Sequence, residues 1–539
     1  MGRQPVYLRP NVVVEPLFNQ WYAWTNLIAP ATSAMYVANL HLKIMQSFIA
    51  SPQIHVSALK NPAMLGGPFI NYGLERVPDI KKLLEKTTSE QAHMLKFAEA
   101  VKTLDHTLLE ESEGLSLERI YKKVPDVLKG FVELGYDLNH NPSARFIEGL
   151  LYRSPCYNTS SQSIGLSTVT RDDRSFVFST PRLSREGYLN LQVPFSSGGI
   201  DTLFEMRHTP RAIEEVAEAL QVGQNDYDLF SSFFTESPTR AAAHEGSTYT
   251  GPDVRVRYYG HACLLIETED TSILCDPVIS YDTDFDIPHY ALADLPEKID
   301  YVVITHNHQD HCMFETLLQI RHKVNHVIVP KNNGGNLADP SMKLVLQSVG
   351  FKNVIEIDET ESVEIPGGSI TGLPFFGEHA DLHIRTKLAY AINLKGNVAI
   401  CAADSENLEP KLYERLHDLT GDADAVFIGM ECDGAPLSWL YGPLLTKPIP
   451  RKLDQSRRSN GSDFEKAIAV VDQLRPKQVY VYAMGQEPWL TYLTSIRYTD
   501  ESRPIVESNK LVAECRSRGL ISERLFGQKE LILKQNRSQ

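Results

Sequence analysis

The stretch "YVVITHNHQDHCMFETL", residues 301–317, places three histidines and one aspartate directly after an apolar run. Its first four residues have the β-branched, apolar character of a buried strand, and helical spacing resumes after Cys312. A turn between a strand and a helix can aim several side chains at one point, and imidazole and carboxylate are ligands for zinc, iron or manganese. The spacing fits two adjacent metal ions, the first two residues serving one and the last two the other. The four candidate ligands are His306, His308, Asp310 and His311.

This H-x-H-x-D-H spacing is the signature of the metallo-β-lactamase superfamily, which the chain resembles from about residue 252 onward. The resemblance implies an αββα sandwich, and the pattern agrees, because strand-like segments such as "VRVRYYG" and "VNHVIVP" alternate with helical ones such as "DFEKAIAVVDQL". The expected fold class is therefore α/β, with a C-terminal sandwich preceded by a mixed α+β N-terminal domain.

The chain has 539 residues, too many for one ordinary domain. In the first part, "SEQAHMLKFAEAVKTLDHTLLEE" and "PRAIEEVAEALQV" have helical spacing, while "SFVFSTPRL" and "YLNLQVPF" are typical of strands. A small, polar, Gly- and Pro-bearing stretch follows and is the best linker candidate. We predict an N-terminal domain over residues 1–237, a linker over 238–252 and a catalytic domain over 253–539.

Composition and charge exclude several classes of protein. A formal net charge of −15 argues against nucleic acid as the main partner. The seven cysteines are scattered without a C-x-x-C pair, which fits a reducing cytoplasm better than a disulfide framework. Residues 16–42 carry no Lys, Arg, Asp or Glu, but polar side chains are spread through them. We therefore expect a buried or interface helix there, with no membrane span and no signal peptide.

Further candidate ligands follow later strands. Asp404, in "VAICAADSE", stands where the superfamily places a carboxylate that bridges both metals; the alternative is a helix N-cap. Asp276, in "ILCDP", matches an early aspartate that orients a ligand histidine, or else belongs to an Asp-Pro turn. His261, in "GHACLLIE", is either a residue of the metal pocket or a satisfied core histidine.

The histidines that complete the sites of hydrolytic relatives are missing or displaced. In the middle position, "FFGEHADLH" offers Glu378 or His379, and no histidine occurs after His417. Two histidines with one carboxylate and open positions are associated with oxygen-activating non-haem iron, which favours Glu378 as the ligand. A histidine ligand at 379 would instead favour zinc.

With these residues, the chain resembles the di-iron β-hydroxylases of nonribosomal peptide and antibiotic biosynthesis. The resemblance implies two oxo- or hydroxo-bridged iron ions, O₂ as co-substrate and an external two-electron donor, an unidentified reductase. It implies β-hydroxylation of an amino acid held as a thioester on the phosphopantetheine arm of a nonribosomal peptide synthetase carrier domain. The N-terminal domain is expected to support a homodimer and to cover the active site. No catalytic residue beyond the metal ligands is expected.

A basic, helix-breaking stretch in this acidic chain, "LTKPIPRKLDQSRRSNGSD", includes Arg457 and Arg458. It is either a contact for an acidic carrier domain or a solvated loop. Two other functions stay open from the residues alone. One is a di-zinc hydrolase of lactones, phosphodiesters or N-acyl phospholipids, and the other is a scaffold whose metals are only structural.

Overall fold

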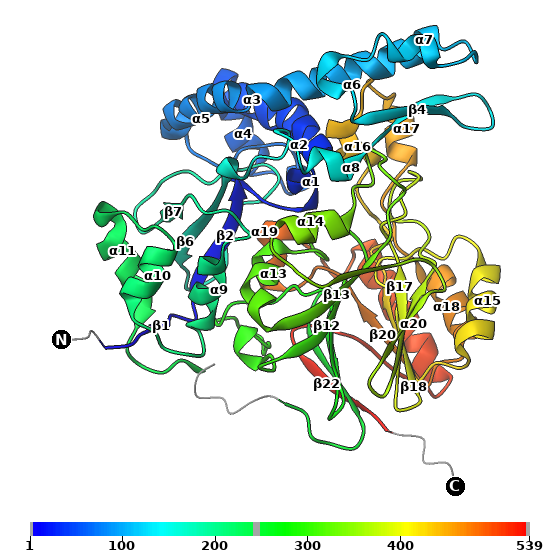
Figure 1. Ribbon diagram of the computed structural model, residues 1–539. Helices are drawn as coiled ribbons and strands as arrows, with labels where there is room; N and C mark the ends of the chain where they lie inside the picture. Colours follow the sequence, from blue (N-terminus) through cyan, green and yellow to red (C-terminus); the bar gives the residue numbers. More distant parts are fainter. Residues whose placement is uncertain (1–3, 241–247, 535–539) are drawn as a thin grey trace.

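The computed structural model describes residues 4–240 and 248–534. Residues 241–247, inside the predicted linker, lie outside the described residues. The division of the chain at 237 and 253 stays a prediction. The elements from β1 to β8 and those from β9 onward are nevertheless easily told apart in Figure 1.

Two seven-stranded sheets make up the later part of the chain. The first has the order β14 (Val354–Ile357), β13 (Val324–Pro330), β12 (Ile299–Val303), β11 (Ser272–Cys275), β10 (Cys263–Glu267), β9 (Val254–Gly260), β22 (Lys529–Leu533). The second has the order β15 (Ser362–Ile365), β16 (Gly368–Leu373), β17 (Ala389–Leu394), β18 (Asn397–Cys401), β19 (Ala425–Gly429), β20 (Gln478–Tyr482), β21 (Ile521–Arg524). Each sheet contains both antiparallel and parallel pairs, since β11 runs parallel to β12 and β18 parallel to β19.

Apolar side chains of both sheets share one core, to which the first sheet contributes Val256 and Val303 and the second contributes Ile392 and Phe427. Helices cover the two outer faces. On the second sheet these are α15 (Pro410–Thr420), α18 (Phe464–Leu474) and α20 (Arg503–Ser517). On the first sheet they are α13 (Phe314–Ile320) and α14 (Met342–Ser348). Helix, sheet, sheet and helix layers confirm the predicted sandwich.

The N-terminal part is mixed α+β, as predicted. Its sheet has the order β3 (Trp21–Tyr22), β2 (Val12–Phe18), β6 (Gln162–Thr168), β7 (Leu189–Leu191), and two further pairs join β1 (Tyr7–Leu8) to β8 (Phe234–Thr235) and β4 (Val132–Tyr136) to β5 (Pro142–Phe146). Its helices are α1 (Thr25–Ile28), α2 (Pro30–Tyr36), α3 (Leu42–Ala50), α4 (Pro52–Ala58), α5 (Val77–Glu90), α6 (Ala92–Glu111), α7 (Glu118–Tyr121), α8 (Glu148–Leu151), α9 (Gly198–Glu205), α10 (Ile213–Ala219) and α11 (Tyr227–Ser232).

Short helices of the later part reach back toward this N-terminal layer. They are α16 (Leu437–Tyr441), α17 (Arg451–Ser456) and α19 (Thr491–Thr494). The segment between α16 and α17 contacts α6, because the Thr446 hydroxyl donates a hydrogen bond to Asp105. The N-terminal part therefore packs on the sandwich at the end from which α16 projects.

Two local expectations differ from the structure. The charge-free segment begins as strand β2 and becomes helical only at Thr25; it is buried by the chain itself, so it gives no support to a dimer. In the described part of the chain, no helix is both long and apolar enough to cross a membrane.

The predicted strand over 175–183 is an irregular loop, because Phe176 and Phe178 pack against Trp439 and not within a sheet.

A buried cluster of charges, the Arg174 network, joins the two parts of the chain. The Arg174 guanidinium lies 3.1 Å from the Glu15 carboxylate of β2, 2.7 Å from that of Asp172 and 3.0 Å from that of Glu315 on α13. It also lies 3.8 Å from the ring centroid of Tyr492. These side chains are almost entirely shielded from solvent, and the three carboxylates surround the cation closely.

Candidate metal centre

The predicted ligands meet where strands of both sheets end. His306 follows β12, Asp276 follows the parallel neighbour β11, and Asp404 follows β18 in the other sheet. His261 lies in the turn between β9 and β10, and Glu378 lies in the loop after β16. Side chains at the carboxyl ends of neighbouring parallel strands share one edge of a sheet, and here the edges of two sheets face each other.

Three groups of side chains bring their donor atoms within 4.8 Å of one another. They are His306, His308 and Glu378; His306, His311 and Asp404; and His261, Asp310 and His311. Every sequence-predicted ligand is therefore in the cluster, and His306 and His311 each belong to two groups. The predicted pairing of the motif residues is compatible with this arrangement, because Asp404 lies between the two pairs.

Glu378, and not His379, reaches the first pair of histidines. One Glu378 carboxylate oxygen lies 2.7 Å from His308 Nδ1, and the other lies 3.8 Å from His306 Nε2. The ring of His379 stands behind the carboxylate, with its Nδ1 2.7 Å from Glu378 Oε2. Burial alone would raise the pKa of Glu378, but His308 and His379 lower it to about 2.

His311 is held by carboxylates on both of its ring nitrogens. Its Nδ1 donates to Asp276 Oδ2 over 2.8 Å, and Asp276 in turn accepts from the backbone N–H and the hydroxyl of Thr305. His311 Nε2 lies 3.0 Å from Asp404 Oδ2. Because Asp276 holds the proton on Nδ1, Nε2 is free to bind a metal, which fits the orienting role predicted for Asp276.

His261 is in the cluster, but its tautomer argues against a ligand role. The backbone N–H of Gly485 donates to His261 Nδ1 over 3.1 Å, so a neutral His261 carries its proton on Nε2. That N–H points at Asp310, whose Oδ2 lies 3.4 Å away. His261 therefore orients Asp310 as a hydrogen-bond donor.

Two buried donor atoms of the cluster, His306 Nε2 and Asp404 Oδ1, have no hydrogen-bond partner among the described residues, and Glu378 Oε2 has only the ion pair with His379 Nδ1. Buried polar atoms are almost always paired, and buried carboxylates even more so. An unpaired carboxylate oxygen of Asp404 and an unpaired ring nitrogen of His306, in one group of donor atoms, are what a bound cation would satisfy. The donor set fits metal ions, with more oxygen than a di-zinc hydrolase site offers.

Sequence reasoning missed two residues that adjoin the cluster. Glu431 follows β19, the parallel neighbour of β18, after which Asp404 stands. It lines the cavity of about 240 Å³ beside the cluster, which we call the metal cavity. Burial, and then the charges of Asp404, Asp310 and Glu378, raise the pKa of Glu431 well above its usual range. Its position after a strand of that sheet was the available signal.

The second missed residue is Tyr441, at the end of α16. Its hydroxyl lies 3.0 Å from His308 Nε2, on the side of the ring opposite Glu378. With His308 Nδ1 facing the cluster, Nε2 carries the proton and Tyr441 accepts it. No local pattern marks this residue, since α16 reaches the cluster only through tertiary packing.

The backbone around the cluster is strained. His261, Asp276, Glu378 and Ala403 all have positive φ values, between 37° and 62°, although none is glycine. Such conformations cost about 1–3 kcal/mol each and persist where the surroundings impose them. They turn the chain sharply after each strand, which aims the ligands inward.

The two arginines predicted as a carrier contact lie near this site. Arg457 Nε donates to the carbonyl of Ala380, in the loop that carries Glu378. Arg458 lines the metal cavity, donates to Gln455 and lies 3.6 Å from the Asp433 carboxylate. Both side chains are half-buried, and their role as a carrier contact stays a prediction.

Comparison with known proteins covers both parts of the chain. Residues 7–238 match the family described as diiron non-heme beta-hydroxylase N-terminal domain, and residues 255–401 match a beta-lactamase superfamily domain. The 4-amino-L-phenylalanyl-[CmlP-peptidyl-carrier-protein] 3-hydroxylase of Streptomyces venezuelae is 38% identical over 534 residues, covering 98% of this chain and 99% of that protein.

Solved structures agree. The crystal structure of CmlA, a diiron beta-hydroxylase from Streptomyces venezuelae, matches with a TM-score of 0.91 and 36% identity, over 98% of this chain and 100% of that one. Other relatives match only in part. The UPF0173 protein of Pyrococcus abyssi is 31% identical over 126 residues, which cover 23% of this chain and 50% of that protein.

Proposed function

The chain belongs to the diiron non-heme β-hydroxylase family, and we propose that it hydroxylates the β-carbon of an amino acid tethered as a thioester to a nonribosomal peptide synthetase carrier domain. One observation carries the proposal for this chain's own site. Buried carboxylate and imidazole atoms are left unpaired at the meeting of the strand ends, in a set richer in oxygen than a zinc hydrolase would use.

We assign the ligands as follows. His306, His308 and Glu378 would hold one iron, Asp310 and His311 would hold the other, and Asp404 would be shared by both groups. The groupings of donor atoms and the two-sided position of Asp404 support this assignment. Glu431, a further carboxyl in the same cavity, is available to whichever ion has an open position.

When bound, the irons would supply the activation of O₂, and overall one oxygen atom enters the Cβ–H bond of the substrate while the other leaves as water. Two electrons from an external reductase and two protons balance the reaction. The residues of this chain would hold the irons, and their neighbours orient the ligand side chains. Asp276 and Tyr441 fix the tautomers of His311 and His308, and His261 donates its N–H toward Asp310.

The N-terminal part contributes to the enclosure of the site, because Leu65 and Gly66 line the metal cavity together with His308 and Asp404. Excluding water from that cavity protects the oxidant from side reactions. The carrier domain as partner is supported by the printed activity of the full-length relative. A reductase, a homodimer and a cytoplasmic location are parts of the proposal without separate support.

The test is single-turnover oxidation of the diferrous enzyme by O₂, comparing loaded carrier, empty carrier and free amino acid. We expect rapid oxidation and a product heavier by one oxygen atom only with the loaded carrier, because docking of the carrier helps to position the β-carbon. Equal turnover of the free amino acid would rule out the tethered substrate. Protein from iron-replete cells that holds two zinc ions and negligible iron would rule out the oxygenase.

A further inference from the structure

The loop that carries Glu378 has a backbone conformation that few residue types favour. Gly377, Glu378, Ala380 and Asp381 all have positive φ values, between 52° and 75°. Three of the four are not glycine, and such residues keep this conformation only where their surroundings impose it. At Gly377 no side chain would fit, because a Cβ there would lie 2.4 Å from the Cβ of Glu406. We refer to residues 377–381 as the Glu378 loop.

Two cationic side chains hold the Glu378 loop from outside it. The Lys387 ammonium donates a hydrogen bond to the carbonyl of Gly377 over 3.0 Å. Arg457 Nε donates to the carbonyl of Ala380 over 2.8 Å. Hydrogen bonds from a charged donor are stronger than those between neutral groups. Glu378 lies between the two anchored carbonyls in the sequence, so the cations fix the backbone on both sides of it.

Arg457 is itself attached to α16. It follows α17 as the cap of that helix, and its backbone carbonyl accepts a hydrogen bond of 2.9 Å from the N–H of Leu437, the first residue of α16. The next residue, Arg458, pairs with Pro436 in an isolated antiparallel bridge. The position of Arg457 therefore follows that of α16.

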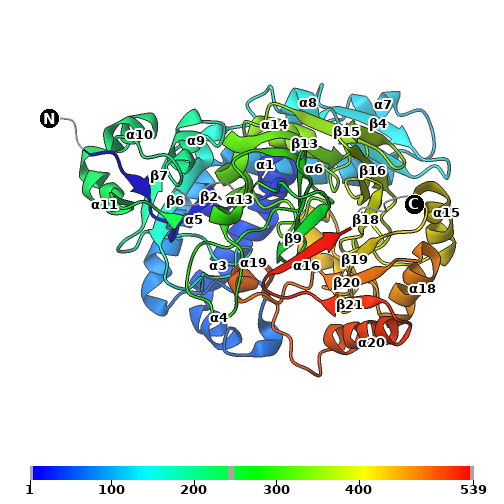
Figure 2. The ribbon, with the colours of Figure 1, turned by 90° about the horizontal axis from the view of Figure 1, so that it is seen from below.

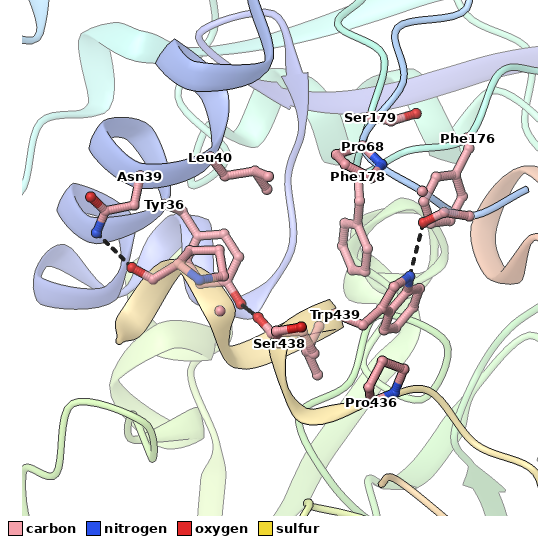
Figure 3. A pocket seen from close by; sticks show the side chains of 15 residues that line it. Tyr36, Asn39, Leu40, Pro68, Phe176, Phe178, Ser179, Pro436, Ser438 and Trp439 are labelled. Carbon is pink, nitrogen blue, oxygen red and sulfur yellow. Dashed lines mark hydrogen bonds between the residues drawn. The ribbon is translucent and has the colours of Figure 1, made fainter. Parts of the chain in front are cut away.

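The N-terminal part in turn holds α16 in place. The indole Nε1 of Trp439, on α16, donates to the carbonyl of Gly66 over 2.9 Å. The side-chain amide of Asn39 donates to the carbonyl of Pro443, just after α16, over 2.7 Å. Figure 3 shows both hydrogen bonds as dashed lines, and the ring of Trp439 packs against Phe178 with centroids 5.6 Å apart. Helix α16 is therefore a firm support for Arg457.

The α16 helix and the Glu378 loop meet at one ligand histidine. The Tyr441 hydroxyl, at the end of α16, lies 3.0 Å from His308 Nε2. A Glu378 carboxylate oxygen lies 2.7 Å from His308 Nδ1, on the other side of the ring. Because Arg457 is hydrogen-bonded to both segments, it sets the spacing between the two groups that hold the His308 ring.

We propose that Arg457 is a positioning residue of the site formed by His306, His308 and Glu378, where it keeps the Glu378 carboxylate in place for the metal. This inference rests on the proposed function, because it takes Glu378 as an iron ligand. Without Arg457, the Ala380 carbonyl loses its charged partner and the left-handed residues can relax, which moves Glu378 away from His308. This role faces the inside of the protein, unlike a contact with the carrier domain.

Competition with a chelator tests this role on the iron-loaded enzyme without any carrier. Arg457→Met removes the hydrogen-bond donor but retains an apolar stem, and we expect it to weaken the binding of one of the two irons about tenfold. Arg451→Met is the matched control, because Arg451 is an exposed cation at the start of α17. It should bind both irons as the wild type does.

Two further variants separate positioning from a general structural role. Arg457→Lys restores a charged donor, so its iron affinity should lie closer to that of the wild type than to that of Arg457→Met. In Glu378→Ala, which should retain the other iron, adding Arg457→Met should leave the affinity for that iron unchanged, because the ligand on which Arg457 acts is already absent. The optical spectrum of the oxidised protein should change in Arg457→Met and recover in Arg457→Lys.

Wild-type iron affinity in Arg457→Met would overturn the inference. Weaker binding of the remaining iron in the double variant would overturn it as well, because Arg457 would then support the whole cluster and not Glu378. An unchanged iron affinity with a raised KM for the loaded carrier would make Arg457 a docking residue instead. Failure of the wild type to hydroxylate any loaded carrier would contradict the proposed function alone, since the chelator measurement uses no carrier.

Discussion

The metal cluster and the Arg174 network are both buried collections of charge in one chain, but only one of them is complete. In the network, three carboxylates surround one guanidinium within about 3 Å, and the ring of Tyr492 covers its face. In the cluster, Asp404 Oδ1 and His306 Nε2 stay unpaired. Charges paired within the chain hold its parts together, whereas charges left open mark where something else must bind.

The largest effect expected on the open cluster comes from the carboxylate shared by both groups of ligands. Asp404→Ala should lose both irons, from about two per chain to nearly none, because each ion loses a ligand at once. The metal-free variant should be less stable than the metal-free wild type, because His311 Nε2 loses its buried carboxylate partner. Metal analysis and thermal unfolding check both parts.

Asp433→Ala is the matched control, because Asp433 is an exposed carboxylate that lines the same cavity. It should keep both irons. Equal iron loss in the two variants would mean that general negative charge, and not ligation by Asp404, retains the metal.

Removal of a ligand from one group should have a smaller effect. Glu378→Ala is expected to lose about one iron per chain and most reactivity with O₂, while His379→Ala should keep both, because only the Glu378 carboxylate reaches His306 and His308. Iron content and the optical spectrum of the oxidised protein report the outcome. The reverse pattern would transfer the ligand role to His379 and favour zinc.

Substitutions in the Arg174 network should change the stability of the protein and not its metal content. Arg174→Met leaves the buried carboxylates of Asp172 and Glu315 without a cation, although Glu15 keeps Arg182 at 2.9 Å. It should lower the free energy of unfolding of the metal-free protein by about 3–5 kcal/mol. Denaturant unfolding measures this. Arg171→Met removes an exposed ion pair with Asp286 and should change it by about 0–1 kcal/mol. Similar small losses in both variants would contradict the comparison.

The smallest expected effect concerns the orientation of His308. Tyr441→Phe removes the acceptor of the His308 Nε2 proton and should weaken iron binding about tenfold. Competition with a chelator measures the affinity. Tyr36→Phe is the control, because the Tyr36 hydroxyl donates to the Leu440 carbonyl on the same helix without touching a candidate ligand. Unchanged affinity in Tyr441→Phe would remove Tyr441 from the site.

The sequence predicted those features of the site that strand ends encode. The motif turn, Asp276 and Asp404 each follow an apolar strand, and the resemblance to the metallo-β-lactamase superfamily identified the two aspartates as site residues. Tyr441 and Trp439 were not predicted, because α16 reaches the site only through tertiary packing between segments that are distant in sequence. The strand predicted at 175–183 was wrong for a related reason: Phe176 and Phe178 alternate with other residues because they face a cavity, and the same alternation is typical of a sheet.

The pairing of β22 with β9 has a consequence for folding during translation. In Figure 2 the red strand β22 lies next to β9, and the register joins Leu533 to Val254. One edge of β9, the first strand of the sandwich, therefore gains its partner only about 280 residues later. At ordinary translation rates this delay is roughly a quarter of a minute to a minute. The N-terminal part leaves the ribosome first. We therefore expect the sheet edge to stay open, and iron loading to be delayed, until synthesis of β22 is finished.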